Sequence, residues 1–177
     1  MRRISLHWVV ALCVCAVCAW CAIPRAKAEF HAQDWELTLA GAASNDSGFS
    51  QASIGKSGSL GYFATHDLEL SFRDTIVYTD EGRQTMSNIR AAAAADWHFP
   101  LDRGHRIIPF VGANIGYQFG KHAHDTWFAG PEAGIKYFIR HDTFLFARLE
   151  YDFNFDTTGD SGRDQQMVYQ FGIGFRF

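Results

Sequence analysis

The last stretch of the chain alternates between two kinds of side chain. From residue 165 onward, odd positions are mainly aromatic or aliphatic, whereas even positions are mainly small or polar. The odd set is Gln165, Met167, Tyr169, Phe171, Ile173, Phe175 and Phe177, and the even set is Gln166, Val168, Gln170, Gly172, Gly174 and Arg176. Because successive side chains of a β-strand point to opposite faces, this period of two predicts a strand with one apolar face.

The same alternation recurs in seven earlier segments. They span residues 35–43, 49–63, 68–78, 88–99, 107–120, 127–140 and 145–155. A tilted strand needs roughly 9–11 residues to cross a bilayer, which is about the length of these segments. The sequence therefore predicts an all-β fold, an eight-stranded antiparallel transmembrane β-barrel.

Two of these segments carry a charge on the face that is otherwise apolar. Segment 49–63 has the weakest pattern, because it is rich in Gly and Ser and places Lys56 on that face. Its register stays open at this point. In segment 68–78, Asp74 falls on the apolar face. This predicts either a position near the lipid headgroups or a β-bulge that shifts the register.

The first 28 residues predict a secretory signal peptide. Arg2 and Arg3 form a basic start, residues 9–23 are apolar, and residues 26–28 (AKA) have the small residues of a cleavage site before Glu29. A membrane-anchor helix is the alternative, but the apolar run of about 15 residues is shorter than the roughly 20 that a spanning helix needs. The predicted organisation is a cleaved signal peptide over residues 1–28 and an outer-membrane β-barrel domain over residues 29–177.

Removal of that segment changes the chemistry of the chain. All four cysteines, at positions 13, 15, 18 and 21, leave with it, so no disulfide framework is expected. Lipidation of one of these cysteines is the alternative, and it is disfavoured because none of the four follows a small residue. The remaining chain has 12 basic and 19 acidic residues and no basic patch of the kind that binds nucleic acid.

Composition favours a membrane barrel over a soluble one. Aromatic residues make up 15% of the chain, and the mean hydropathy of −0.13 is too polar for a bundle of membrane helices. In a soluble barrel the aromatic faces would point inward and overfill the narrow interior. The aromatic residues also gather near the ends of the segments, as in the interfacial girdles of membrane barrels. Trp35, Trp97, Phe99, Phe175 and Phe177 are expected at the inner interface, and Tyr78, Phe119, Trp127 and Phe155 at the outer one.

Three segments resemble strands of a known family. They are Pro109 to Tyr117 (PFVGANIGY), Gly130 to Phe138 (GPEAGIKYF) and the closing Gly172 to Phe177 (GIGFRF). Together they resemble the outer-membrane β-barrel superfamily that includes the OmpA transmembrane domain, OmpX and opacity-type proteins. The resemblance implies the bacterial outer membrane as the location and a terminal aromatic residue, Phe177, that the barrel-assembly machinery recognises. The short predicted outer loops depart from members that carry adhesion on long loops.

The polar face predicts a charged barrel interior. Six acids, Glu36, Glu69, Asp96, Glu132, Glu150 and Asp152, meet six bases, Arg73, Arg90, Lys136, Arg140, Arg148 and Arg176. Because an unpaired buried charge costs several kcal/mol, these groups are expected to pair and to close the lumen. A narrow channel for ions or very small solutes is the alternative, and a wide porin is excluded by the strand number.

The sequence predicts no catalytic, cofactor-binding or metal site. Ser87 and Asp74 are expected near each other on the lipid face, but no His accompanies them, so a lipid-modifying enzyme is only the third hypothesis. His122 and His124 with Asp125 have side chains of the types that bind metal ions, but they are interpreted as solvated loop residues.

The expected function is structural, in envelope integrity or surface interaction. The expected partners are outer-membrane lipid and lipopolysaccharide and, through Phe177, the assembly machinery. No surface ligand is predicted.

Overall fold

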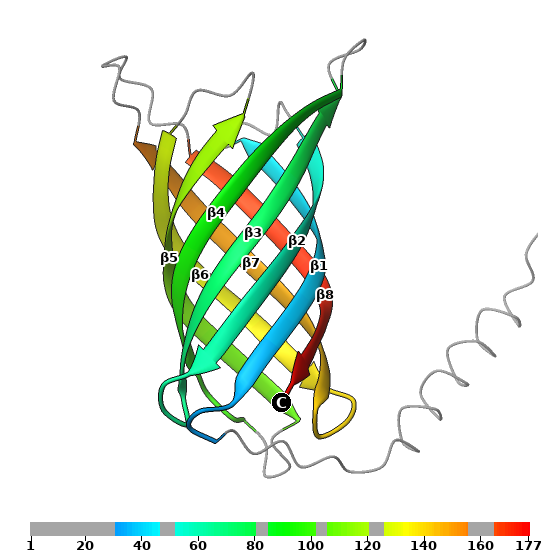
Figure 1. Ribbon diagram of the computed structural model, residues 1–177, viewed down its shortest axis with the longest axis vertical. Helices are drawn as coiled ribbons and strands as arrows, with labels where there is room; N and C mark the ends of the chain where they lie inside the picture. The colour runs from blue at the N-terminus through cyan, green and yellow to red at the C-terminus, as the bar shows by residue number, and fades with distance from the viewer. Residues whose placement is uncertain (1–30, 47–51, 81–84, 102–105, 121–125, 156–164) are drawn as a thin grey trace, which may run out of the picture.

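The protein is a closed antiparallel β-barrel, as the alternating pattern predicts (Figure 1). The computed structural model describes residues 31–46, 52–80, 85–101, 106–120, 126–155 and 165–177. The predicted signal peptide and its cleavage site lie outside these residues. The eight strands are β1 (Trp35–Asp46), β2 (Ala52–Phe63), β3 (Leu68–Asp80), β4 (Thr85–His98), β5 (Ile107–Gly120), β6 (Thr126–Phe138), β7 (Thr143–Phe155) and β8 (Gln165–Arg176).

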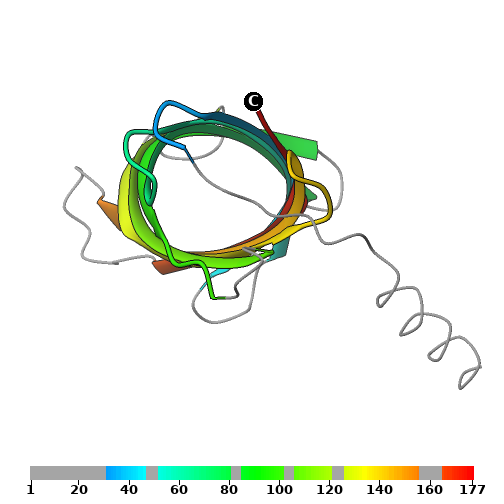
Figure 2. The same ribbon diagram turned by 90° about the horizontal axis from the view of Figure 1, so that it is seen from below.

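Each strand pairs with its neighbours in the chain, and β1 pairs with β8 to close the ring (Figure 2). The last strand ends beside the start of the first, where Trp35 and Phe177 exchange two backbone hydrogen bonds of 2.9 Å. Short turns over residues 64–67 and 139–142 lie at this same end. Bacterial barrels have their short turns on the periplasmic side, so we call it the periplasmic end. Within the described residues, no helix is long and apolar enough to cross a membrane.

The predicted division into an outer and an inner face is confirmed. On β8, Tyr169 and Phe171 are exposed, whereas Val168 and Gln170 between and beside them are buried. The same alternation holds on the other strands, so the barrel presents an apolar wall to its surroundings and encloses the polar residues.

The register of β2 and β3 shows where Lys56 and Asp74, the two charges on otherwise apolar strand faces, point. Gly58 pairs with Asp74 and Lys56 pairs with Ile76 in an unbroken antiparallel ladder. No bulge interrupts β3, so Asp74 points outward, and the bulge alternative is wrong. Lys56 also points outward. Strand β1 is longer than expected and continues past Ala43 to Asp46.

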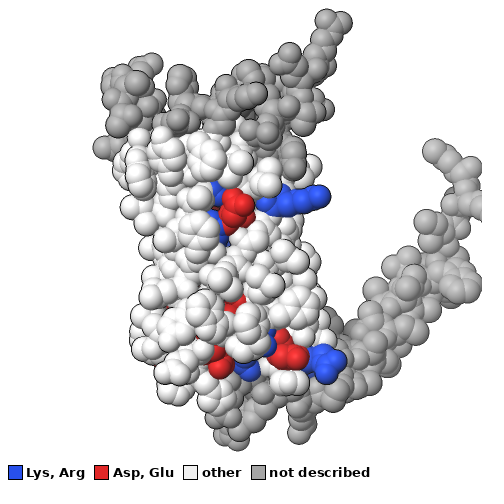
Figure 3. Space-filling view, in the orientation of Figure 1, with Lys and Arg blue, Asp and Glu red and all other residues white. Residues whose placement is uncertain are grey.

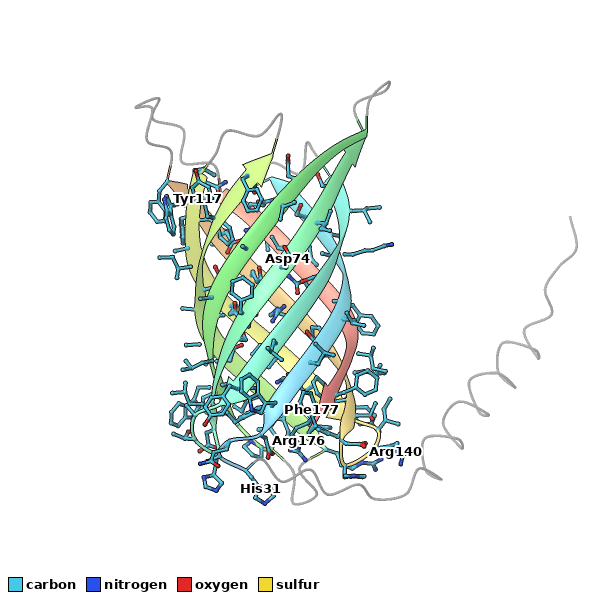
Figure 4. All side chains as sticks on the ribbon, in the orientation of Figure 1. His31, Asp74, Tyr117, Arg140, Arg176 and Phe177 are labelled. Atoms are coloured by element: carbon cyan, nitrogen blue, oxygen red, sulfur yellow. The ribbon has the colours of Figure 1, made fainter. Side chains whose placement is uncertain are left out.

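Aromatic side chains surround both ends of the wall. At the periplasmic end, Trp35 packs beside Tyr62 with 5.1 Å between ring centroids. At the other end, Tyr117 packs edge-on against Trp127 at 5.2 Å. Figure 4 shows Phe177 and Tyr117 at these opposite ends. The other described members of the two predicted girdles, namely Trp97, Phe99, Phe175, Phe119 and Phe155, are exposed, while the side chain of Tyr78 lies outside the described part of the structure.

The visible wall is almost free of charge along most of its height. In Figure 3, the Lys, Arg, Asp and Glu side chains on this face gather near the lower, periplasmic end and at one level in the upper half. An apolar band between aromatic girdles is the surface that a bilayer requires of a membrane barrel.

Candidate functional site

The charged lumen is the candidate site, because nearly all the charged residues of the strands point into it. All six predicted acids are buried there. Four of the six predicted bases are buried with them, namely Arg73, Arg90, Lys136 and Arg148.

Of the other two predicted lumenal bases, Arg140 lies outside the lumen and Arg176 lies at its rim, over the Phe138 ring. Strand β6 ends at Phe138, so Arg140 falls in the turn that follows. Its side chain is 71% exposed and its Nε lies 3.9 Å from Oδ1 of Asp142, so the prediction that it faces the lumen is wrong. Arg176, the last residue of β8, lies at the periplasmic rim, where it donates a hydrogen bond to the backbone carbonyl of His141. Figure 4 shows both arginines at this end.

Arg73 is the centre of an ion-pair cluster that crosses the lumen. Its guanidinium on β3 donates to Oδ2 of Asp96 on the adjacent β4 at 2.5 Å. It also donates to Oε2 of Glu132 on β6 at 2.6 Å, and Glu150 on β7 lies 3.6 Å away. Because β3 and β6 are not neighbours in the ring, this bond connects separate parts of the wall through the interior.

Polar neighbours extend this cluster along β7 and β8. The Nε of Arg148 lies 3.1 Å from Oε1 of Glu150, and its terminal nitrogen donates to the side-chain oxygen of Gln170. Gln170 in turn donates to Glu150 at 3.2 Å. The Asn114 amide donates to Glu132 at 3.1 Å. Each charged group of this network thus has an opposite charge beside it, which offsets part of the cost of burial, although some of its buried atoms, among them Arg73 Nε and Glu132 Oε1, have no hydrogen-bond partner among the described residues.

A second pairing lies further from the periplasmic end. Arg90 on β4 donates to Oδ2 of Asp152 on β7, and both side chains are almost completely buried. The Arg90 guanidinium also stacks over the Phe128 ring, 4.0 Å from its centroid. A guanidinium gains from such stacking when it is shielded from water.

Lys136 forms the third cluster, nearer the periplasmic end. Its ammonium donates to Glu36 at 2.6 Å and to Glu69 at 2.8 Å. It also lies between 5.1 and 5.6 Å from the ring centroids of Phe63, Phe110 and Phe144. The cation is thus held both by carboxylates and by aromatic faces.

An apolar plug, as we call it, lies in the periplasmic half of the interior. It consists of buried side chains that pack together, namely Phe63, Ile108, Phe138, Phe144 and Phe146. The alternating pattern did not predict it, because the inner face was expected to be small or polar. The available signal was the phenylalanines at inner-face positions of the segments, such as Phe110, Phe128 and Phe144, each of which the structure places opposite a glycine.

One small void lies between these clusters. This void, bordered by Arg73, Arg90, Phe128 and Gln170, has a volume of about 10 Å³, roughly that of one water-sized probe.

The residues considered for catalysis and metal binding do not form a site among the described residues. Asp74 is exposed on the lipid face, as expected, and the side chain of Ser87 lies outside the described part of the structure. His122, His124 and Asp125 also fall outside it. Within the described ranges, no group of three or more His, Cys, Asp or Glu residues is arranged to hold a metal ion.

Comparisons with known proteins agree with this architecture. No family model matches the chain. Outer membrane porin F of Pseudomonas aeruginosa is 25% identical over 132 residues, which cover 68% of this chain and 37% of that protein. The chain thus spans about 37% of the length of this curated relative.

Solved structures of small outer-membrane proteins share the fold. Neisserial surface protein A (NspA) superposes with a TM-score of 0.64 at 17% identity, covering 81% of this chain and 96% of that one. OprG of Pseudomonas aeruginosa gives 0.62 at 10% identity, with 86% and 99% covered. The N-terminal barrel of OprF from the same organism gives 0.56 at 20% identity, with 80% and 97% covered. This chain therefore has the fold of the small outer-membrane barrels, and its location is the bacterial outer membrane.

Proposed function

We propose that this outer-membrane β-barrel is a structural protein with a closed lumen that serves envelope integrity or surface interaction. The observation that carries the proposal is the bond from Arg73 to Glu132, which crosses the interior, while the same guanidinium also bonds Asp96 on the adjacent strand. A solute would have to separate these partners, and breaking a buried ion pair by losing one partner costs about 3–5 kcal/mol.

The apolar plug supports the same conclusion independently. Its members are almost completely buried, and two of them, Phe63 and Phe144, lie beside the Lys136 ammonium. An ion in this half of the interior would meet phenylalanine side chains, which give it no ligands to replace its water, and carboxylates that are already bonded to Lys136. An eight-stranded barrel is also narrow enough for its own side chains to fill.

The test is the conductance of refolded protein lacking residues 1–28 in a planar bilayer. We expect no conductance steps once insertion has been verified by the difference in gel mobility between heated and unheated samples. A wide porin in the same bilayer serves as the positive control. Discrete steps that change in size with Glu132→Gln or Arg148→Gln would overturn the closed-lumen proposal.

A narrow ion channel is the second candidate. It is favoured by the similarity to a protein named as a porin. If the lumen conducts, cations should pass more readily than anions, because the six buried carboxylates outnumber the four buried Lys and Arg side chains among the described residues. The reversal potential in a salt gradient measures this preference.

The cellular role has its own test. Cells that lack the protein should become more sensitive to detergents if it supports the envelope, and expression of the wild-type chain should restore resistance. Unchanged sensitivity would contradict the integrity role. A loss of binding to surfaces or host material in the same cells would then support surface interaction.

A further inference from the structure

The lipid-facing wall has a hollow that extends over four consecutive strands of the ring, β6, β7, β8 and β1. The hollow has a volume of about 530 Å³ and is open toward the bilayer. Its outward-facing lining consists of Gly41, Ala43, Ala133, Ala147, Leu149, Tyr169 and Phe171. Four of these seven residues are Gly or Ala. Their small side chains leave a depression beside the larger Leu149, Tyr169 and Phe171.

A lysine stands at the edge of this hollow. Lys56 on β2 is the direct cross-strand partner of Gly41, which lines the hollow, and Gly41 in turn pairs with Phe171. Directly opposed residues of an antiparallel pair have their Cβ positions about 5 Å apart. Lys56 is exposed and is the fifth residue of β2, so it lies nearer the outer end of that strand than the periplasmic end.

A charge on a lipid-facing wall is costly unless it reaches a headgroup or an opposite charge. Within the described part of the chain, the Lys56 ammonium has neither an ion pair nor a hydrogen bond. Its long side chain allows the ammonium to extend toward the headgroups while its methylene groups cover apolar surface. A phosphate group of a lipid in the outer leaflet would provide the missing counter-ion.

We propose that Lys56 and the hollow together bind one phosphorylated, acylated lipid of the outer leaflet. The phosphate lies at the Lys56 ammonium, and an acyl chain of the same molecule occupies the hollow beyond Gly41. This inference rests on the outer-membrane location and is independent of whether the lumen is closed.

Asp74 is the other charge on this part of the wall, and it lies on the side of Lys56 away from the hollow. It is opposed by Gly58 on β2 and by Ala91 on β4, so it is a diagonal neighbour of Lys56. Figure 4 shows Asp74 in the upper half of the barrel. Its carboxylate competes with the phosphate for the lysine, so its removal should not weaken lipid binding.

The experiment measures lipid retained by the refolded protein, detected by native mass spectrometry after detergent washing. The probe is a bis-phosphorylated, multiply acylated glucosamine disaccharide. The same molecule without its phosphates and phosphatidylglycerol serve as comparison lipids. Lys56→Gln should lower retention of the phosphorylated probe about fivefold, and the dephosphorylated probe should be retained weakly by wild type and variant alike.

A pair of glycine variants tests the hollow. A Cβ at Gly41 would meet only the Phe171 carbonyl at 4.0 Å, and one at Gly58 would meet its nearest atoms at 3.8 and 3.9 Å, so both outward positions have room. Only Gly41 lines the hollow. Gly41→Leu should therefore reduce retention of the probe, whereas Gly58→Leu and Asp74→Asn should leave it at or above the wild-type level.

Folding of each variant is verified by heat-dependent gel mobility. Equal retention by Lys56→Gln and wild type would overturn the assignment of the phosphate, and equal effects of the two leucine variants would overturn that of the hollow. Equal retention of phosphatidylglycerol and the disaccharide probe would overturn the choice of an outer-leaflet lipid. None of these results depends on conductance. The lipid-site inference and the closed-lumen proposal can therefore be overturned independently of each other.

Discussion

The ring of Phe144 covers Gly174, its direct cross-strand partner on β8. A Cβ atom on Gly174 would lie less than 3.0 Å from three ring atoms of Phe144, a distance that real Cβ atoms essentially never show. The same relationship joins Phe110 to Gly134. Aromatic rings that cover glycines are a known means of holding strand register, and here they also form the apolar interior near the periplasmic end.

Gly174→Ala should therefore destabilise the barrel. The added methyl group must displace the Phe144 ring from a filled interior, and overpacking of this kind costs about 1–3 kcal/mol. The measurement is the free energy of unfolding in urea in the presence of lipid vesicles. Gly58→Ala is the matched control, because its Cβ on the outer wall would meet its nearest atoms at the ordinary contact distances of 3.8 and 3.9 Å. Equal stability of the two variants would contradict the proposed packing.

Arg73→Met should lower stability strongly. The change leaves Asp96 and Glu132 buried without their cation, which is expected to cost about 3–5 kcal/mol. Adding Glu132→Gln should recover part of the loss by removing one of the uncompensated charges. Arg140→Met, in the exposed turn, should have almost no effect. Urea unfolding again gives the values, and a small effect of Arg73→Met would show that the cluster contributes little.

Lys136 and Glu36 should be energetically coupled. Lys136→Met leaves the carboxylates of Glu36 and Glu69 adjacent and without a cation, and Glu36→Gln leaves the ammonium with one partner. Groups in direct contact typically show interaction energies of about 0.5–3 kcal/mol in a double-mutant cycle. Additive effects of the two single changes would mean that the 2.6 Å bond between them has no net influence on stability.

The proposed recognition of Phe177 by the assembly machinery predicts that a substitution of this residue impairs assembly in cells without lowering the stability of the folded barrel. The Phe177 side chain is 71% exposed, so Phe177→Asp should reduce the amount of folded barrel in cells while leaving refolding of purified protein into vesicles almost unchanged. Leu101→Asp is the matched control, because Leu101 is also 71% exposed but lies in the connection between β4 and β5 and does not follow β8. Equal losses in cells from both changes would argue against recognition of the terminal residue.

Much of the fold was predictable from single strands. The alternation around Phe171 and Gln170 predicted which side of β8 faces lipid, and the structure confirms it. Such a prediction needs only the period of two, because the geometry of an extended chain decides the opposite directions of neighbouring side chains. The same reasoning identified all six buried acids.

The lumen was less predictable, because its composition depends on which strands face one another. Phe144 and Phe146 lie on the inner face although they are apolar, and their neighbours in space include Phe63 from a distant part of the sequence. Arg140 continued the alternation of β6 but lies beyond the end of that strand, in a turn. A pattern along one segment contains no information about either the partner across the lumen or the residue at which pairing stops.

The sequence by itself determined the strand number, the two faces of each strand and the apolar outer wall, since these depend on local periodicity and on the bilayer as solvent. Only the tertiary structure decided that Arg73 meets Asp96 and Glu132, that phenylalanines pack together in the periplasmic half of the lumen, and that Lys56 borders a hollow of small residues. The physical reason is that ring closure and register bring together side chains from strands far apart in the chain. Their contacts therefore depend on the relative positions of all eight strands.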